Sequence, residues 1–217
     1  MNKLTLVIGN KNYSSWSLRP WLFLKNLDID FDEEMVFLFN ASMEEKLKPY
    51  FSGNKVPVLL DNDLQVWDSL AIIETIADRY PEKYGWPKDL KARAVARSVS
   101  AEMHSGFFAL RNALPMNCRK HVPNHFIEND VQKDVDRIIA IWEFCRNNYG
   151  ANGPWLFGEF SGADAMFAPI VLRFSSYGVK LSGTAKKYSE TVLQNSHTKN
   201  WIDAGKKEKQ VIEMNEV

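Results

Sequence analysis

The segment KVPVLLDNDLQVWDSLAIIETIADRY (residues 55–80) contains two short apolar runs followed by an amphipathic helical pattern. The runs at 58–60 and 64–67 are separated by Asp-Asn-Asp, residue types that favour a turn, so they predict two strands joined by that turn. The stretch 69–80 predicts a helix, because apolar residues recur at spacings of three and four, at Ile72, Ile73, Ile76, Ala77 and Tyr80. This segment therefore predicts the second half of a mixed α/β domain.

The residues before it predict the first half of the same domain. KLTLVIG (3–9) is short, rich in β-formers and bounded by Gly-Asn, which indicates a strand. A helix is expected from about 15 to 27, a second strand over 30–39 and a short helix with an acidic start over 42–51. The resulting order, β-α-β-α-β-β-α, defines an α/β fold class for this part of the chain.

The stretch PEKYGWPKDLK (81–91) interrupts this pattern with two prolines and a glycine, as linkers do. Helical patterns follow it, at 92–114 (ending near Pro115), 130–150, 162–177 and, as shorter helices, 184–205. The third is so apolar that it is expected in a core. We therefore predict an α/β domain over 1–81, a linker over 82–90 and an all-α domain over 91–217.

Composition excludes several classes of protein. The chain has 27 basic and 27 acidic residues, so its net charge favours neither nucleic acid nor a membrane surface as a partner. The first residues are too polar for the core of a signal peptide, and no apolar run reaches the ~20 residues that span a bilayer. Cys118 and Cys145 form no metal-binding pattern, and both are expected to be reduced thiols. These features predict a soluble cytoplasmic protein.

The stretch NYSSWSLR (12–19) lies where the first strand gives way to a helix. Serine commonly caps such a helix start, so Ser14 or Ser15 is expected to do so. A serine hydrolase is disfavoured because the chain has no G-x-S-x-G. A thioredoxin-like domain carries its C-x-x-C redox pair at this junction, where this chain has Ser14-x-x-Ser17. In such a fold the thiol would have to come from a bound substrate.

Two further motifs lie at the ends of predicted strands. Pro57 in NKVPVL either begins a strand or forms a cis-proline turn that leaves the backbone of Val56 free to pair with an extended ligand. Asp68 and Ser69 open a helix, where they either cap it or offer a hydroxyl and N–H groups to a ligand carboxylate.

The histidines offer little for metal binding. His121 and His125 have the spacing of a helical metal pair, but Pro123 between them argues against a regular helix. No metal is expected.

Four motifs in this order resemble those of cytosolic glutathione S-transferases. YSSWSLRPW (13–21) is similar to the zeta-class pattern of two serines, a cysteine, a serine, one residue and an arginine. KVPVL (55–59) resembles the family's cis-proline turn, and DSLAIIETI (68–76) its acidic-serine helix start. GEFSGADAMFAPIVLRF (158–174) resembles the C-terminal motif, in which Ser161 and Asp164 form a capping box. The resemblance covers essentially the whole chain and implies the glutathione transferase fold, thioredoxin-like and then all-helical.

The resemblance also implies roles for individual residues. The first domain would bind glutathione as co-substrate, with Ser14, or else Ser15, donating a hydrogen bond to the glutathione sulfur. The remaining glutathione-binding residues would be Lys55, Val56, Pro57, Asp68 and Ser69. The candidates for an electrophile pocket between the domains are Tyr13, Trp16, Met103, Phe107 and Arg111. Met103 and Phe107, four residues apart, are alternatively core residues, and Arg111 is alternatively a solvated charge on its helix face. Arg19 is expected in a structural ion pair.

The expected activity is transfer of glutathione to a small hydrophobic electrophile, with isomerase or peroxidase chemistry of the same thiolate as variants. A glutathione-transferase-like binding module with little turnover is the alternative from another class. A dithiol oxidoreductase is excluded, because the active loop has no cysteine. Trp16 stands where the zeta pattern has cysteine, which predicts a differently shaped pocket. Family members are homodimers, and the same is expected here.

Overall fold

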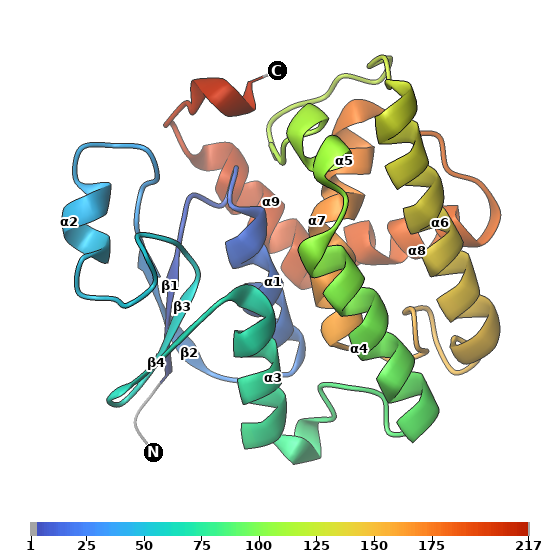
Figure 1. The fold of residues 1–217 in the computed structure, drawn as a ribbon, viewed down its shortest axis with the longest axis horizontal. Coiled ribbons are helices and arrows are strands. Elements are labelled where there is room, and N and C mark those ends of the chain that lie inside the picture. Colours follow the sequence, from blue (N-terminus) through green and yellow to red (C-terminus); the bar gives the residue numbers. More distant parts are fainter. Residues whose placement is uncertain (1–3, 217) are drawn as a thin grey trace.

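The computed structural model describes residues 4–216, and its N-terminal part is built on one four-stranded sheet (Figure 1). The strands are β1 (Leu4–Ile8), β2 (Phe31–Met35), β3 (Val58–Asp61) and β4 (Leu64–Trp67). They lie in the order β2-β1-β3-β4, with β1 parallel to β2 and antiparallel to β3. β3 and β4 form the predicted hairpin, in which Leu59 lies opposite Val66. This is a thioredoxin-like sheet, as predicted, although β2 is shorter than the expected 30–39.

The two faces of the sheet are covered by different helices. These are α1 (Ser15–Asn26), α2 (Met43–Leu47) and α3 (Ser69–Arg79). Side chains alternate along a strand, so Leu6 and Ile8 of β1 join the core formed with α1 and α3. Val7 points the other way and joins a small cluster with Leu47 of α2. The central strands β1 and β3 are thus covered on both faces, and the loops at one end of the sheet are free to form a site.

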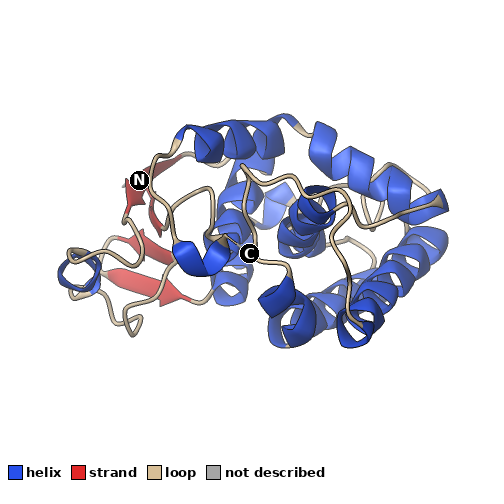
Figure 2. Ribbon diagram, turned by 90° about the horizontal axis from the view of Figure 1, so that it is seen from above, coloured by secondary structure: helices blue, strands red, loops and turns tan. Residues whose placement is uncertain are grey.

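The rest of the chain is helical. It comprises the 3₁₀ turn η1 (Pro81–Lys83), α4 (Leu90–Ser105), α5 (Phe108–Ala113), α6 (Asn129–Tyr149), α7 (Gly162–Tyr177), α8 (Gly183–Gln194), α9 (Ser196–Lys207) and the 3₁₀ turn η2 (Glu213–Asn215). In Figure 2 the strands lie together at one end of the molecule and most of these helices at the other. None of the helices within residues 4–216 is long and apolar enough to cross a membrane.

α7 is the central helix of this part, as its apolar sequence predicts. α1 and α4 both pack against it, and one continuous hydrophobic cluster joins the sheet to the helices. The predicted capping box is present at its start, where the Ser161 N–H donates to Asp164 Oδ2 over 2.9 Å. Burial raises the pKa of Asp164 to about 6. Because the core is continuous, the division into domains at 82–90 stays a prediction.

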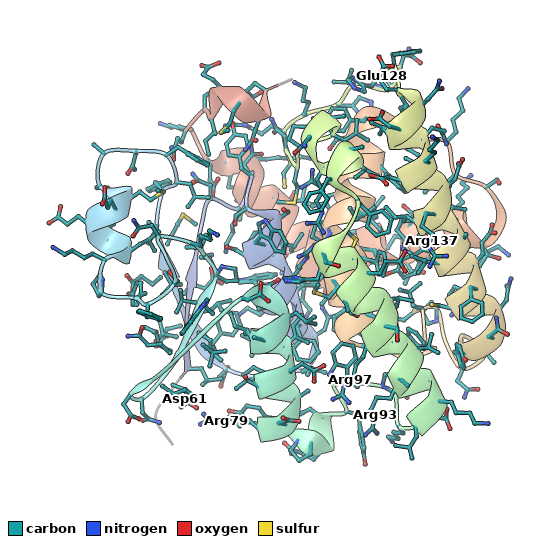
Figure 3. The ribbon with its side chains drawn as sticks, in the orientation of Figure 1. Asp61, Arg79, Arg93, Arg97, Glu128 and Arg137 are labelled. Atoms are coloured by element: carbon teal, nitrogen blue, oxygen red, sulfur yellow. The ribbon has the colours of Figure 1, made fainter. Side chains whose placement is uncertain are left out.

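Ion pairs join the helices to neighbouring elements, and Figure 3 labels Asp61 and Arg79, the two partners of one such pair. Arg97 of α4 donates two hydrogen bonds, of 3.0 and 2.9 Å, to the Glu74 carboxylate of α3. Arg79 at the end of α3 pairs with Asp61 at the end of β3. The pair between Arg97 and Glu74 joins the helical part to the α/β part.

The predicted helix 92–114 is wrong, because the chain breaks between α4 and α5. Phe107 has a left-handed backbone, with φ of 63°, directly after Gly106. Side chains from elsewhere satisfy the ends created by the break. Arg111 donates to the carbonyls of Met103 and His104, and Asp134 accepts from the Leu110 N–H over 3.0 Å. The break turns Arg111 back towards the end of α4.

Candidate functional site

A cavity of about 770 Å³ lies between the strand-to-helix loops and the helical part. It is lined by ten of the residues predicted from the sequence, namely Tyr13, Ser14, Ser15, Trp16, Lys55, Val56, Pro57, Asp68, Ser69 and Arg111. His104, Met116 and Arg173 of the helical part also line it. The three separate motifs of the α/β part thus meet at one cavity.

Ser14 caps α1 and is held by a chain of hydrogen bonds. Its Oγ accepts from the Ser17 N–H over 3.3 Å and lies 2.8 Å from Ser17 Oγ. Ser17 Oγ in turn accepts from the Gly9 N–H over 3.0 Å and is fully buried. The Ser14 hydroxyl is therefore fixed at the positive end of α1, at the wall of the cavity.

Ser15 has different surroundings, although it is the next residue. Its Oγ accepts a hydrogen bond of 3.3 Å from Arg173 Nη2, on the central helix α7. The two serines therefore differ in their partners: a second hydroxyl for Ser14 and a guanidinium for Ser15.

The turn before β3 is a cis-proline turn, the second of the two forms predicted for Pro57. The Val56–Pro57 peptide bond is cis. Ser52 holds the turn, because its Oγ donates to the Lys55 carbonyl over 2.7 Å and accepts from the Lys55 N–H over 3.3 Å. Lys55 is exposed at the rim of the cavity.

Asp68 caps α3, which is one of the two roles predicted for it, and does so in an unusual backbone conformation. Its Oδ1 accepts from the N–H groups of Leu70 and Ala71, over 2.8 and 3.4 Å. Its φ is 73°, a region that costs a non-glycine residue on the order of 1–3 kcal/mol. The neighbouring Ser69 is buried and accepts a 3.5 Å hydrogen bond from Arg19 Nη1.

His104, on α4, is a cavity residue that the sequence did not reveal. Its Nε2 lies 3.2 Å from Asp68 Oδ2, and its ring meets the Trp16 ring edge-on at 5.3 Å. Burial lowers the pKa of His104, and the positive charges of Arg19 and Arg111 act in the same direction against the Asp68 carboxylate. The neutral imidazole therefore donates its Nε2–H to Asp68.

The predicted electrophile pocket is realised in part. Tyr13, Trp16 and Arg111 line the cavity. Met103 and Phe107 are not among its lining residues: Met103 is fully buried in the main hydrophobic cluster, and Phe107 is buried in the same cluster. Phe107 is removed by the helix break, since its left-handed backbone takes it off the face that a continuous helix would present.

Two arginines contact the Trp16 ring, and a third, Arg173, lines the same cavity. The guanidinium carbons of Arg19 and Arg111 lie 4.2 and 5.0 Å from centroids of its ring. Arg173 donates to the carbonyls of Arg111 and Leu114 at the end of α5. Burial lowers the pKa of Arg19 and Arg111, and that of Arg173 to about 10. The expected ion pair of Arg19 is wrong, since no carboxylate of residues 4–216 lies within ion-pair distance of it.

A C-terminal segment (208–216) supports the first loop from outside. Glu208 accepts from the N–H groups of Lys11 and Asn12, over 2.7 and 3.0 Å. The Tyr13 hydroxyl donates to Glu216 over 2.6 Å and accepts from Arg119. α9 approaches this loop so closely that a Cβ at Gly205 would lie 2.9 Å from the Asn12 nitrogen. No sequence motif indicated this support.

Other chemistry finds little support in the described part of the chain. It contains no group of three or more histidine, cysteine or acidic side chains placed to hold a metal ion. Cys118 and Cys145 are free and buried, and burial raises the pKa of each thiol to about 12. Neither is a reactive thiolate at neutral pH.

Comparison with known proteins places the chain among glutathione transferases. A family model described as the N-terminal domain of glutathione S-transferase matches residues 13–79. A probable maleylacetoacetate isomerase of Caenorhabditis elegans is 36% identical over 199 residues, which cover 88% of this chain and 91% of that one. Glutathione S-transferase Z2 of Arabidopsis thaliana is 27% identical, covering 74% of each chain.

Solved structures have the same fold. A glutathione transferase homologue from Burkholderia gl BGR1, crystallised with bound glutathione, aligns with a TM-score of 0.70 at 20% identity. The alignment covers 94% of this chain and 98% of that one.

Proposed function

The chain belongs to the glutathione S-transferase superfamily, and on that premise we propose that it binds glutathione and uses the glutathione thiolate to attack an electrophile. The observation that carries the proposal is that one cavity brings all the predicted glutathione-binding residues together. These are Ser14, Ser15, Lys55, Val56, Pro57, Asp68 and Ser69. These residues come from three motifs far apart in the sequence. The bound glutathione of the Burkholderia homologue gives independent support for the ligand.

In the proposed complex the peptide-like glutathione lies along the α/β side of the cavity. The backbone of Val56 pairs with the cysteinyl unit, as a strand edge would. Asp68 attracts the γ-glutamyl amino group, and Ser69 with the start of α3 binds its carboxylate. Lys55, exposed at the rim, reaches the other carboxylate.

Ser14 and the N-terminus of α1 together supply about the energy needed to keep the sulfur ionised. A free thiol has a pKa of about 8.5, and lowering it by about two units requires about 2.7 kcal/mol. A hydrogen bond to a charged acceptor contributes about 1.5–3 kcal/mol, and a helix N-terminus about 0.3–1 kcal/mol. No general base is needed.

Ser17 completes the arrangement. A hydroxyl hydrogen can rotate, so the 2.8 Å contact between Ser17 Oγ and Ser14 Oγ can be donated from either side. When Ser17 donates to Ser14, the Ser14 hydrogen is free to point at the sulfur. Ser17 keeps its own acceptor role towards the Gly9 N–H.

The proposed transfer requires neither a metal ion nor an oxidant or reductant. The glutathione thiol gives its proton to water, and the thiolate forms a C–S bond to the electrophilic carbon. The leaving group departs with the electron pair of the bond that breaks. In the isomerase variant, the thiolate adds to a conjugated double bond and leaves again after rotation.

The test is calorimetric titration of glutathione into the wild type and Ser14→Ala, with the thiolate absorbance followed in parallel. We expect wild type to bind glutathione as a thiolate, and the variant to lose thiolate absorbance at neutral pH. Absence of glutathione binding to the wild type would refute the proposal. Unchanged thiolate absorbance in Ser14→Ala would leave Ser14 as a helix cap only.

Isomerisation is the second candidate, favoured by the 36% identity to the probable maleylacetoacetate isomerase. Assays with maleylacetoacetate, a hydroperoxide and a set of alkyl halides separate isomerase, peroxidase and transferase. Glutathione binding with no turnover in any of them identifies a binding module instead.

We propose further that the protein is a cytoplasmic homodimer. Phe51 and Trp67 support the dimer, because they form an exposed aromatic pair that a partner could cover. Their rings meet edge-on with centroids 5.3 Å apart, and the residues are 81% and 44% exposed. Light scattering should give twice the 25.0 kDa chain mass, and a monomeric mass would refute it.

A further inference from the structure

A second, smaller cavity of about 280 Å³ opens beside the first. Arg19, Arg111 and Arg173 all line it, with Asn112 at its exposed side and Pro169 as part of an apolar wall. No aspartate or glutamate is among its lining residues, as far as residues 4–216 show. The charged residues of its lining are therefore all basic, and they lie beside an apolar wall.

The guanidinium groups are not fully satisfied by the protein. Arg19 is 2% exposed and Arg173 is 7% exposed. The Nε atom of each is buried without a hydrogen-bond partner in the described chain. Burying an unpaired charge is costly, and like charges close together add to the cost. The geometry therefore leaves positive charge beside the cavity that no carboxylate of its lining balances.

The small cavity is separate from the proposed glutathione position but adjoins it. Lys55, Val56, Pro57, Asp68 and Ser69 line only the large cavity.

Ser15, Trp16, Arg111 and Arg173 line both cavities. The link to the sulfur position is short, because Arg173 Nη2 lies 3.3 Å from Ser15 Oγ and Ser15 follows Ser14 directly. A molecule that reacts with the sulfur can therefore extend past Trp16 towards the arginines.

We propose that the electrophile is an anion, and that its carboxylate or an equivalent oxyanion binds between Arg19, Arg111 and Arg173. The proposal rests on the proposed function and revises one part of it, since the sequence predicted a hydrophobic electrophile. Planar guanidinium forks suit a carboxylate, which accepts two parallel hydrogen bonds. Trp16 and Pro169 contact the apolar part of the same molecule.

Stable conjugates test the anion site without requiring turnover. The probes are glutathione S-conjugates with one, two or three methylenes ending in a carboxylate, each paired with the amide of the same shape. Calorimetry should show the acid of at least one pair binding about tenfold or more tighter than its amide. Equal affinities in all three pairs would overturn the proposal.

Asn112→Asp assigns the effect to this cavity. It adds a negative charge at the exposed side with almost no change of shape, and removes none of the arginine contacts. We expect it to reduce the preference for the acid at least threefold, and to leave the affinity for glutathione itself unchanged. Asn147→Asp is the matched control, because Asn147 is also exposed in the last turn of its helix.

The outcomes separate this proposal from the proposed function. If neither glutathione nor any conjugate binds, the glutathione function is refuted. If the conjugates bind without regard to charge, only the anion site is refuted. A preference for the acid that Asn112→Asp leaves intact would place the anion elsewhere, and also overturns the assignment.

Discussion

The two ends of the site are built in different ways. At the α/β end, the polar groups belong to helix caps and tight turns, and Ser14, the Lys55 backbone and Asp68 each find hydrogen bonds within a few residues. At the other end, long side chains converge from three helices, α1, α5 and α7, and two of them keep unpartnered donors. The first end is complete before a ligand arrives, whereas the second is not.

This difference predicts that the two ends of the site bind different substrates. Preformed caps and turns suit a constant partner with a peptide backbone, which here is glutathione. Unpartnered arginine side chains suit the variable partner, and changes there should alter which electrophile is chosen. The following experiments test this difference between the two ends, beginning with the largest expected effect.

The largest effect is expected at Ser14. Ser14→Ala should lower the rate of glutathione transfer about 10–100-fold, because a hydrogen bond to a charged acceptor contributes about 1.5–3 kcal/mol. The pKa of the bound thiol should rise by about one to two units, which an absorbance titration measures. Ser15→Ala is the matched control and should change the rate about threefold or less. A larger effect at Ser15 than at Ser14 would show that the sulfur binds beside Ser15 at the arginine end, and would contradict the proposed difference between the two ends.

Glu208 should matter for stability, as the distant support of the α/β end. Glu208→Ala leaves the N–H groups of Lys11 and Asn12 without their carboxylate, so we expect the free energy of unfolding in urea to fall by about 1.5–3 kcal/mol. Glu213→Ala, at an exposed position of the same segment, should change it by about 0.5 kcal/mol or less. Equal effects would show that the loop holds its shape alone.

Trp16 lies between the two ends. Trp16→Cys, which restores the zeta pattern, removes the ring from two guanidinium groups, at about 0.5–1 kcal/mol for each contact. We expect a loss of about 1–2 kcal/mol in unfolding free energy, and a weaker distinction between acid and amide conjugates. Trp16→Phe keeps a ring and should lose less of both. An unchanged distinction in Trp16→Cys would show that the arginines do not depend on the ring.

The smallest effect is a pH dependence from His104. Its pKa is lowered in the folded protein, so between that value and about 6.5 the unfolded state binds more protons than the folded state. The free energy of unfolding is therefore unaffected by His104 above about pH 6.5, and it decreases as the pH falls below that value. His104→Asn should flatten the slope of unfolding free energy against pH below 6.5. His197→Asn, in α9 and away from the cavity, is the matched control and should leave that slope unchanged.

Local patterns allowed much of this molecule to be predicted. The hairpin and α3 follow from residues 55–80, and the caps Ser14 and Asp68 from their place at helix starts. The helix break at Phe107 was missed because side chains, and not a helical pattern, satisfy its ends; Gly106 was its one local signal. Arg111 and Asp134 satisfy the broken ends, and neither contact has a local signature.

The arginine end shows the same limit more strongly. Arg19, Arg111 and Arg173 meet only in the folded chain, and no spacing rule relates them. One signal was available: Arg173 is the only charged residue in the second half of the apolar segment 162–177. A lone charge within a stretch expected in a core needs a reason, and the cavity beside it supplies one.

The contacts of Glu208 also have a consequence for how the protein is made. Glu208 is synthesised 197 residues after Lys11, whose N–H it holds. At about 5–20 residues per second, the ribosome needs about 10–40 s to cover that distance. The sheet and its helices are available to fold during this interval, but the loop that carries Ser14 lacks its outer support. In a newly made chain, the sheet and its helices can therefore be folded before the loop that carries Ser14 has its final contacts.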